Sequence, residues 1–255
     1  MSYLNKIPDR IKLYAFDFDG TLVNSLDDLS ITVNIILTRY LLPNLSRKIV
    51  MRCVGDGSKK LLQRAAAVSV KISKPNTIPK VLEEVRFDLD PFTIEKRTDS
   101  YPLFSQFLDE IYQEYQDVYF AQCDKRTVLY PGIEEWLRNI SETGKFAAII
   151  TNKPDAAVKK VIKTLDIEKY FSCIMTPESS GVCKPDPTGL YIAMRKTNVN
   201  ADETVMIGDS VVDVAVGKAA GTLTCAIYGG FEERINLLAA APNILLDRYY
   251  DSRGY

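Results

Sequence analysis

Leu13-Tyr14-Ala15-Phe16 is a short apolar run, and Asp17-Phe18-Asp19-Gly20-Thr21 follows it directly. A short apolar run bounded by polar residues is typical of a buried strand. Two carboxylates at alternate positions leave a strand on the same side, where they repel each other unless a cation or a proton intervenes. Gly20 allows an unusual backbone turn just after them. One such carboxylate can attack a phosphorus atom while the other moves protons. An isolated motif of this kind is also compatible with a plain turn at a strand end.

Five further apolar runs are too short for helices and predict buried strands. Between them lie helical patterns, one from Ile133 to a stop at Gly144 and another over residues 157–165. Asp186 followed by Pro187 predicts a helix with an aspartate N-cap and a proline at its first position. Strands alternating with helices predict an α/β fold, a Rossmann-like parallel sheet covered on both faces. The five runs are residues 146–150, 173–175, 204–207, 223–227 and 244–246.

Residues 25–127 have a different pattern and predict an all-helical domain inserted after the first strand. The sequence from Ser25 to Asp28 resembles a capping box and starts one amphipathic helix, a second covers residues 104–119, and a third begins near Ser58. We therefore expect a discontinuous core of residues 1–24 and 128–255, with hinges near Asn24 and near residues 125–130. Residues 71–100 fit no single period, and we expect an irregular stretch with one helix near residues 79–87.

Composition excludes several classes of function. The chain has 255 residues, a formal net charge of −1 and no histidine. The balanced charge argues against a nucleic-acid or membrane partner, and the lack of histidine excludes Ser-His-Asp and Cys-His catalysis. The cysteines are scattered and form no CxxC, which favours a reducing compartment. No run is long enough to span a bilayer and residues 1–12 lack a signal-peptide core, so we expect a cytoplasmic protein. Whether it is a monomer or a homodimer is left open.

Three more polar clusters follow predicted strands. They are Thr151-Asn152, Lys184 to Pro187, and Gly208-Asp209 through Asp213. Ligands of open parallel sheets bind at the carboxyl ends of the strands. Together with the first motif, these clusters supply a nucleophile, a proton carrier, a hydroxyl donor, a cation and an acidic metal site.

This set of motifs resembles the haloacid dehalogenase-like hydrolase superfamily over essentially the whole chain. The resemblance implies that residues 25–127 are a helical cap of the C1 type, which closes over the core. Val211 and Val212 stand where Arg-Asn is common in the phosphoglycolate phosphatase branch, which the chain otherwise resembles most. The superfamily's four signatures match Asp17/Asp19/Thr21, Thr151, Lys184 and Asp209/Asp213; the branch resemblance lies in residues 52–65, 130–132, 151–154 and 217–221.

The resemblance implies roles for the acidic residues. Asp17 would be the nucleophile that forms an aspartyl-phosphate, and Asp19 the acid for the leaving alcohol and then the base for water. The implied cofactor is Mg²⁺, which prefers carboxylate and water oxygens. Its ligands would be Asp17, the backbone carbonyl of Asp19 and Asp209, with Asp213 supporting them.

The remaining core motifs would bind the phosphoryl group. Thr151 would donate to a phosphoryl oxygen, and we expect Asn152 beside it in the substrate site. Lys184 would balance the charge on Asp17 and the phosphate. Lys153 also follows a strand end closely and is a rival for that role, but Lys184 matches the family motif.

In the helical domain, Arg52 and Gly55 are candidates for substrate binding. The glycines of residues 55–60 lack the third glycine of a dinucleotide loop, and no strand precedes them. Backbone N–H groups beside a helix start can bind an anion, and Arg52, with Lys59, Lys60 and Arg64, can reach a carboxylate. For each of these side chains taken singly, a solvated surface position is the favoured interpretation.

The resulting expectation is a magnesium-dependent phosphatase of a small phosphorylated metabolite, 2-phosphoglycolate by resemblance. The alternatives are a pyrophosphatase, a nucleotidase or another sugar-phosphate phosphatase on the same fold, and lastly a non-catalytic binding protein. A dehalogenase is disfavoured because Asp19 is present, and a mutase of the β-phosphoglucomutase kind because the cap has no histidine.

Overall fold

The computed structural model describes residues 6–74, 77, 82 and 102–248. The chain divides into two compact units, Met1–Ser25 with Thr127–Tyr255, and Leu26–Arg126. The helix predicted near residues 79–87 lies, apart from Leu82, outside the described residues. Among the described helices, none combines the length and the apolar character that crossing a bilayer demands.

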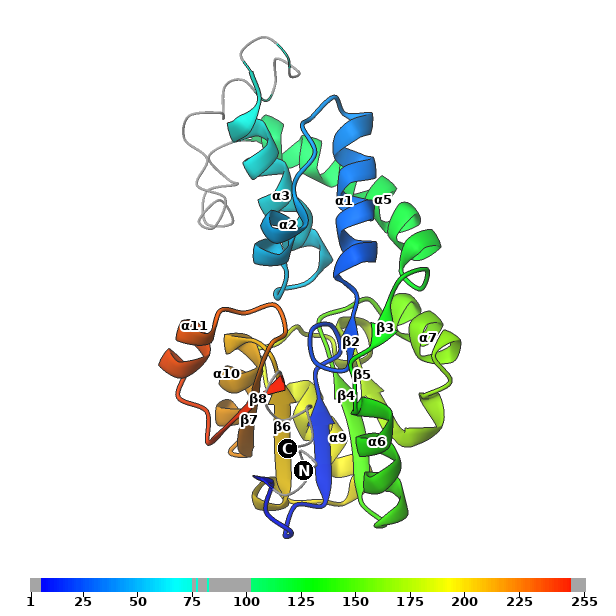
Figure 1. Cartoon of the computed structure of the whole chain (residues 1–255), viewed down its shortest axis with the longest axis vertical. Helices are drawn as coiled ribbons and strands as arrows, with labels where there is room; N and C mark the ends of the chain where they lie inside the picture. The colour runs from blue at the N-terminus through cyan, green and yellow to red at the C-terminus, as the bar shows by residue number, and fades with distance from the viewer. Residues whose placement is uncertain (1–5, 75–76, 78–81, 83–101, 249–255) are drawn as a thin grey trace. The chain divides into compact units, whose positions relative to one another are not determined.

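The first unit is built on a six-stranded sheet in the order β5-β4-β1-β6-β7-β8, and every neighbouring pair is parallel (Figure 1). The predicted α/β Rossmann-like fold is therefore confirmed. β1 is central, so the residues that follow it lie at the middle of the carboxyl edge of the sheet. The strands are β1 (Leu13–Phe16), β4 (Phe146–Ile150), β5 (Phe171–Met175), β6 (Thr204–Gly208), β7 (Leu223–Tyr228) and β8 (Ile244–Asp247).

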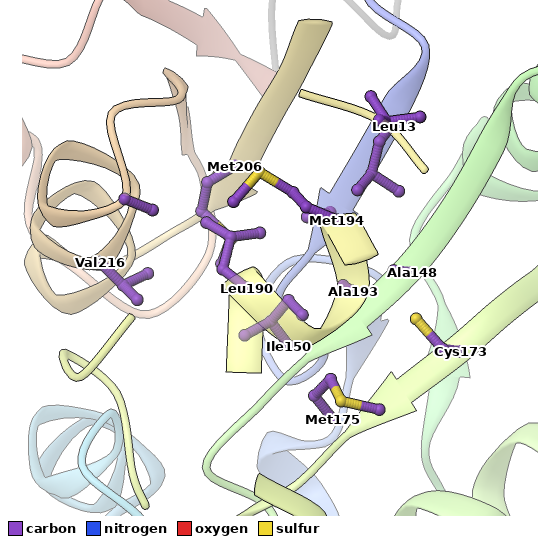
Figure 2. Close-up of a cluster of buried hydrophobic side chains, with 13 residues drawn as sticks. Leu13, Ala148, Ile150, Cys173, Met175, Leu190, Ala193, Met194, Met206 and Val216 are labelled. Carbon is purple, nitrogen blue, oxygen red and sulfur yellow. The ribbon is translucent and has the colours of Figure 1, made fainter. Parts of the chain in front are cut away.

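Helices cover both faces of this sheet. Alternate side chains of β1 point to opposite faces, and since they are apolar on both, each face is buried by packing against helices. Leu13 and Ala15 join a buried cluster that includes Leu190 and Met194 (Figure 2). Phe16, on the other face, makes an edge-to-face contact with Trp136 at 5.1 Å between ring centroids. The helices of this unit are α6 (Ile133–Glu142), α7 (Asp155–Thr164), α8 (Pro177–Ser180), α9 (Thr188–Thr197), α10 (Val211–Ala219) and α11 (Arg234–Ala239).

Two predicted helix starts differ in detail from the structure. α9 begins at Thr188 with Pro187, not Asp186, at the N-cap, although the Asp186 carboxylate still accepts a hydrogen bond from the Thr188 N–H at 2.9 Å. The capping box predicted for Ser25 is not formed, because the buried Ser25 hydroxyl has no hydrogen-bond partner. The Asp28 carboxylate instead accepts the backbone N–H of Arg126 at 3.0 Å.

The second unit contains α1 (Leu26–Arg39), α2 (Arg47–Cys53), α3 (Ser58–Ile72) and α5 (Pro102–Gln122). Its described residues contribute no strand to the main sheet. Three of these helices coincide with the predicted ones, and α2 was not predicted.

A two-stranded antiparallel ribbon, β2 (Val23–Asn24) with β3 (Val128–Leu129), lies where the chain leaves and re-enters the first unit. The backbone N–H of Tyr130 extends this pairing by donating to the Leu22 carbonyl at 3.1 Å. The ribbon brings the two connecting segments side by side next to the loop that follows β1.

Candidate active site

The Lys184 ammonium lies between two carboxylates at the carboxyl edge of the sheet. Its Nζ is 2.7 Å from Asp17 Oδ1 and 2.6 Å from Asp213 Oδ1. Burial alone lowers the pKa of Lys184, but the charges of Asp17 and Asp213 outweigh it and hold that pKa above its usual value. Lys184 is therefore a fixed cation beside Asp17, at the position where the sequence predicted one.

Asp17, Asp209 and Asp213 each place one carboxylate oxygen within 4.8 Å of the others. Burial, together with the charges of Asp213 and Asp209, raises the pKa of Asp17 to about 8. Burial and the charge of Asp213 likewise raise the pKa of Asp209 to about 7. These shifts mean that a single lysine does not balance the negative charge of the cluster, which favours an additional cation there.

Asp209 is held by the two loops beside it. Its Oδ1 accepts the Thr21 hydroxyl at 2.8 Å, and its Oδ2 accepts the Phe231 N–H at 2.7 Å. Gly20 has φ +85°, and an added Cβ there would lie 2.2 Å from Asp209 Oδ2. A side chain at position 20 would therefore both strain the turn and displace the aspartate.

Asp213 has both oxygens engaged by the protein. Oδ1 receives Lys184, and Oδ2 receives the backbone N–H and the hydroxyl of Ser210 at 3.0 and 2.7 Å. These two residues form the capping box that begins α10. The Asp213 carboxylate thus fixes Lys184 in place.

Asn152 lies at the site but binds the protein backbone. Its side-chain amide donates to the Lys184 carbonyl at 3.1 Å and accepts the Lys184 N–H at 2.7 Å. The buried Thr151 hydroxyl accepts the Lys153 N–H at 3.1 Å. Asn152 therefore positions the loop that carries Lys184, a role that the sequence did not reveal.

The rival lysine also lies in the site, but on the other aspartate. Lys153 Nζ is 2.7 Å from Asp19 Oδ1, and the lysine side chain is 1% exposed. The two carboxylates of the first motif thus have separate lysine partners.

The cap candidates all belong to the second unit. Arg52 is exposed at the end of α2, and Gly55 has φ +131° in the loop before α3. Arg64 pairs with the Asp56 carboxylate and donates to the Cys53 carbonyl. Lys59 pairs with Asp109 at 2.8 Å.

Arg248 is a structural part of the site that the sequence did not indicate. Its buried guanidinium donates from Nη2 to the carbonyls of Gly20 and Thr21 at 2.9 and 3.0 Å. It also lies 3.5 Å from the centroid of the Tyr130 ring. Arg248 and Tyr130 therefore fix the turn that follows Asp19. The Ser210-x-x-Asp213 spacing is a readable signal of a helix start, whereas nothing local marks Arg248.

The model of the haloacid dehalogenase-like hydrolase family matches residues 14–227. The chain belongs to this family. A protein named phosphoglycolate phosphatase from Haemophilus influenzae is 28% identical over 240 residues, which cover 94% of this chain and 96% of that protein. A protein of the same name from Pseudomonas syringae pv. tomato is 29% identical over 245 residues, which cover 96% of this chain and 78% of that protein.

Solved structures agree with this assignment. The crystal structure of a predicted phosphoglycolate phosphatase from Haemophilus somnus superposes with a TM-score of 0.71 at 26% identity, covering 93% of this chain and 94% of that one. A putative phosphoglycolate phosphatase from Lactobacillus delbrueckii has a TM-score of 0.77 at 23% identity, covering 92% and 94%, and supports the fold. The recognised superfamily and branch are confirmed, as is the enzyme class, a hydrolase acting on phosphate monoesters.

Proposed function

We propose that this family member is a magnesium-dependent phosphatase of a small phosphorylated metabolite, and that 2-phosphoglycolate is its substrate. The observation that carries the proposal is the convergence of Asp17, Asp209 and Asp213 around the Lys184 ammonium at the end of β1. The names of the relatives support the choice of substrate.

The donor set fits a hard cation. It consists of carboxylate oxygens, which Mg²⁺ prefers, and the raised pKa values of Asp17 and Asp209 support the binding of additional positive charge. Asp17, Asp209 and the backbone carbonyl of Asp19 would hold the ion. Bound there, it would screen the negative charges of the nucleophile and the phosphoryl group from each other.

The side chains would divide the reaction between them. Asp17 attacks phosphorus, a carboxylate O–P bond forms, and the P–O bond to the leaving alcohol breaks. Asp19 donates its proton to that alcohol oxygen and then takes a proton from the water that hydrolyses the aspartyl-phosphate. Thr151 and Lys184 bind the phosphoryl oxygens.

The direct test is phosphate release from a panel of phosphorylated metabolites in the presence of Mg²⁺. We expect the highest kcat/KM for 2-phosphoglycolate. A preference for pyrophosphate, a nucleotide or a sugar phosphate would replace the substrate but keep the reaction. Absence of phosphate release from every compound, by protein shown to be folded, would refute the proposed function.

Replacement of Arg52 by alanine tests the cap's part in specificity. If Arg52 binds the substrate carboxylate, the change should raise KM for 2-phosphoglycolate by the equivalent of about 1–3 kcal/mol. KM for p-nitrophenyl phosphate, which has no carboxylate, should stay the same. Lys48→Ala, an exposed change on the same helix, is the matched control. Equal effects of Arg52→Ala on both substrates would assign the residue a structural role.

Replacement of Asp19 by asparagine should remove proton transfer while leaving the nucleophile intact. General acid–base catalysis contributes about 10²–10⁴-fold, but p-nitrophenolate leaves readily without a proton. The first step should therefore slow far more with 2-phosphoglycolate than with p-nitrophenyl phosphate. Because hydrolysis of the phosphoenzyme needs a base in both cases, rapid mixing with p-nitrophenyl phosphate should show a burst followed by a slow steady state. Equal first-step losses for the two substrates would contradict the role of Asp19.

A further inference from the structure

Lys153 and Asp19 form a largely buried ion pair, and the proposed mechanism assigns no role to the lysine. Lys153 Nζ lies 2.7 Å from Asp19 Oδ1, with the lysine side chain 1% and the aspartate side chain 16% exposed. An ion pair between solvent-exposed side chains adds little to the stability of a fold or to the fixing of either side chain. Here the lysine is almost completely removed from water, so its attraction for the carboxylate is much less screened.

Several contacts fix the position of this lysine. Its backbone N–H donates to the Thr151 hydroxyl, which anchors the loop between β4 and α7. Its ammonium lies 5.4 Å from the centroid of the fully buried Phe18 ring, the residue between the two aspartates. The ammonium is therefore held by the neighbouring motif, and its distance from Asp19 does not depend on a mobile surface side chain.

The two lysines are not equivalent. Lys184 bridges Asp17 and Asp213, whereas Lys153 contacts Asp19 through a single oxygen, Oδ1. No hydrogen bond to Asp19 Oδ2 is found among the described residues. The pair thus fixes one oxygen of the carboxylate and leaves the other to exchange a proton.

We infer that Lys153 is a positioning residue for Asp19, holding its carboxyl group in the orientation that proton transfer needs. This inference rests on the proposed function. With Oδ1 held by the ammonium, Oδ2 is the oxygen that gives its proton to the leaving alcohol as the P–O bond breaks. A fixed orientation of the acid removes the conformational search that would otherwise precede the transfer. In the second step the same contact keeps the carboxylate oriented toward water.

The test compares Lys153→Met, Lys153→Arg and the control Lys159→Met in rapid-mixing and steady-state kinetics. Lys153→Met should slow phosphoenzyme formation from 2-phosphoglycolate by about 10²-fold, the lower end of the range for general acid–base catalysis. It should barely affect that step with p-nitrophenyl phosphate, leave the substrate Kd obtained from rapid mixing unchanged and produce a burst. Lys153→Arg keeps the charge and should recover part of the rate. Lys159, which is exposed and pairs with Asp155 on α7, should be replaceable without effect.

A double variant separates this role from the others. If Lys153 acts through Asp19, adding Lys153→Met to Asp19→Asn should cost nothing further, whereas independent effects would multiply. Multiplying effects, equal losses with both substrates, or a raised substrate Kd in rapid mixing would overturn the inference and assign Lys153 to phosphoryl binding. Unchanged kinetics in Lys153→Met would overturn it too. Thermal unfolding of each variant identifies a loss of fold. If Lys153→Met does not fold, Lys153→Arg is compared with the wild-type protein instead. Equal losses with both substrates in Lys153→Arg would then refute the inference. An inactive wild-type protein would refute the proposed function itself.

Discussion

Asp17→Asn should abolish turnover of every phosphorylated substrate. The amide is close in size to the carboxylate but is not a nucleophile, so no bond to phosphorus forms and neither step proceeds. Neither a burst of nitrophenolate nor a covalent phosphoenzyme should be detectable by rapid mixing and quenching. The loss should exceed that of Asp19→Asn, because a proton can come from water in the latter, whereas a missing nucleophile has no substitute within the site.

The control for this variant is Asp9→Asn. Asp9 is exposed and precedes β1, whereas Asp17 follows it, so both variants lose one carboxylate next to the same strand. Asp9→Asn should retain wild-type kinetics. A burst or a trapped phosphoenzyme in Asp17→Asn would show that another residue is the nucleophile and would exchange or discard the roles of Asp17 and Asp19.

Local sequence was sufficient for the strands of the core. The predicted run at residues 146–150 coincides with β4, and the runs that became β6 and β7 end one residue early. The edge strand β5 begins at Phe171, two residues before the predicted run. The exposed Ser172 interrupts the apolar pattern, so the sequence revealed only the second part of the strand. Buried strands are marked by continuous apolar runs, whereas a polar residue within a short strand, as in β5, breaks the run by which it is recognised.

The sequence did not predict α8, α10 or α11, nor α2 and the β2–β3 ribbon, and the last two show why. α2 has seven residues with two buried side chains, Val50 and Cys53, too few for a recognisable period. The β2–β3 ribbon pairs two residues with two others more than a hundred positions away. Neither segment has a pattern of its own, so only the folded chain reveals them.

The candidate site was predictable where its residues follow strands, since the ends of parallel strands meet at one edge of a sheet. The partner of each side chain was not. Lys153 and Lys184 are both lysines close to strand ends, and the sequence does not indicate that one contacts Asp19 and the other Asp17. Arg248 reaches the first motif from the end of the chain's described part. Such pairings depend on the tertiary packing of segments distant in sequence.

Removal of divalent cations should eliminate turnover, and Mg²⁺ should restore it. Without the ion, the carboxylates of Asp17, Asp209 and Asp213 remain crowded around a single lysine, and a phosphoryl dianion would add to the repulsion. Binding can also be measured without activity. An ion that binds the folded protein stabilises it by about 2.7 kcal/mol at a hundredfold excess over its Kd, so Mg²⁺ should raise the melting temperature of the wild-type protein.

Asp209→Asn and Asp202→Asn form a matched pair for this prediction, because Asp209 follows β6 and the exposed Asp202 precedes it. Asp209→Asn should lose both the activation by Mg²⁺ and the rise in melting temperature, whereas Asp202→Asn should keep both. Asp209→Asn should still fold, because its amide oxygen can accept the Phe231 N–H and its amide N–H can donate to the Thr21 hydroxyl, which can accept as well as donate. Full activity of the wild-type protein in excess chelator would rule out the metal, and an undiminished Mg²⁺ response in Asp209→Asn would place the ion away from this carboxylate.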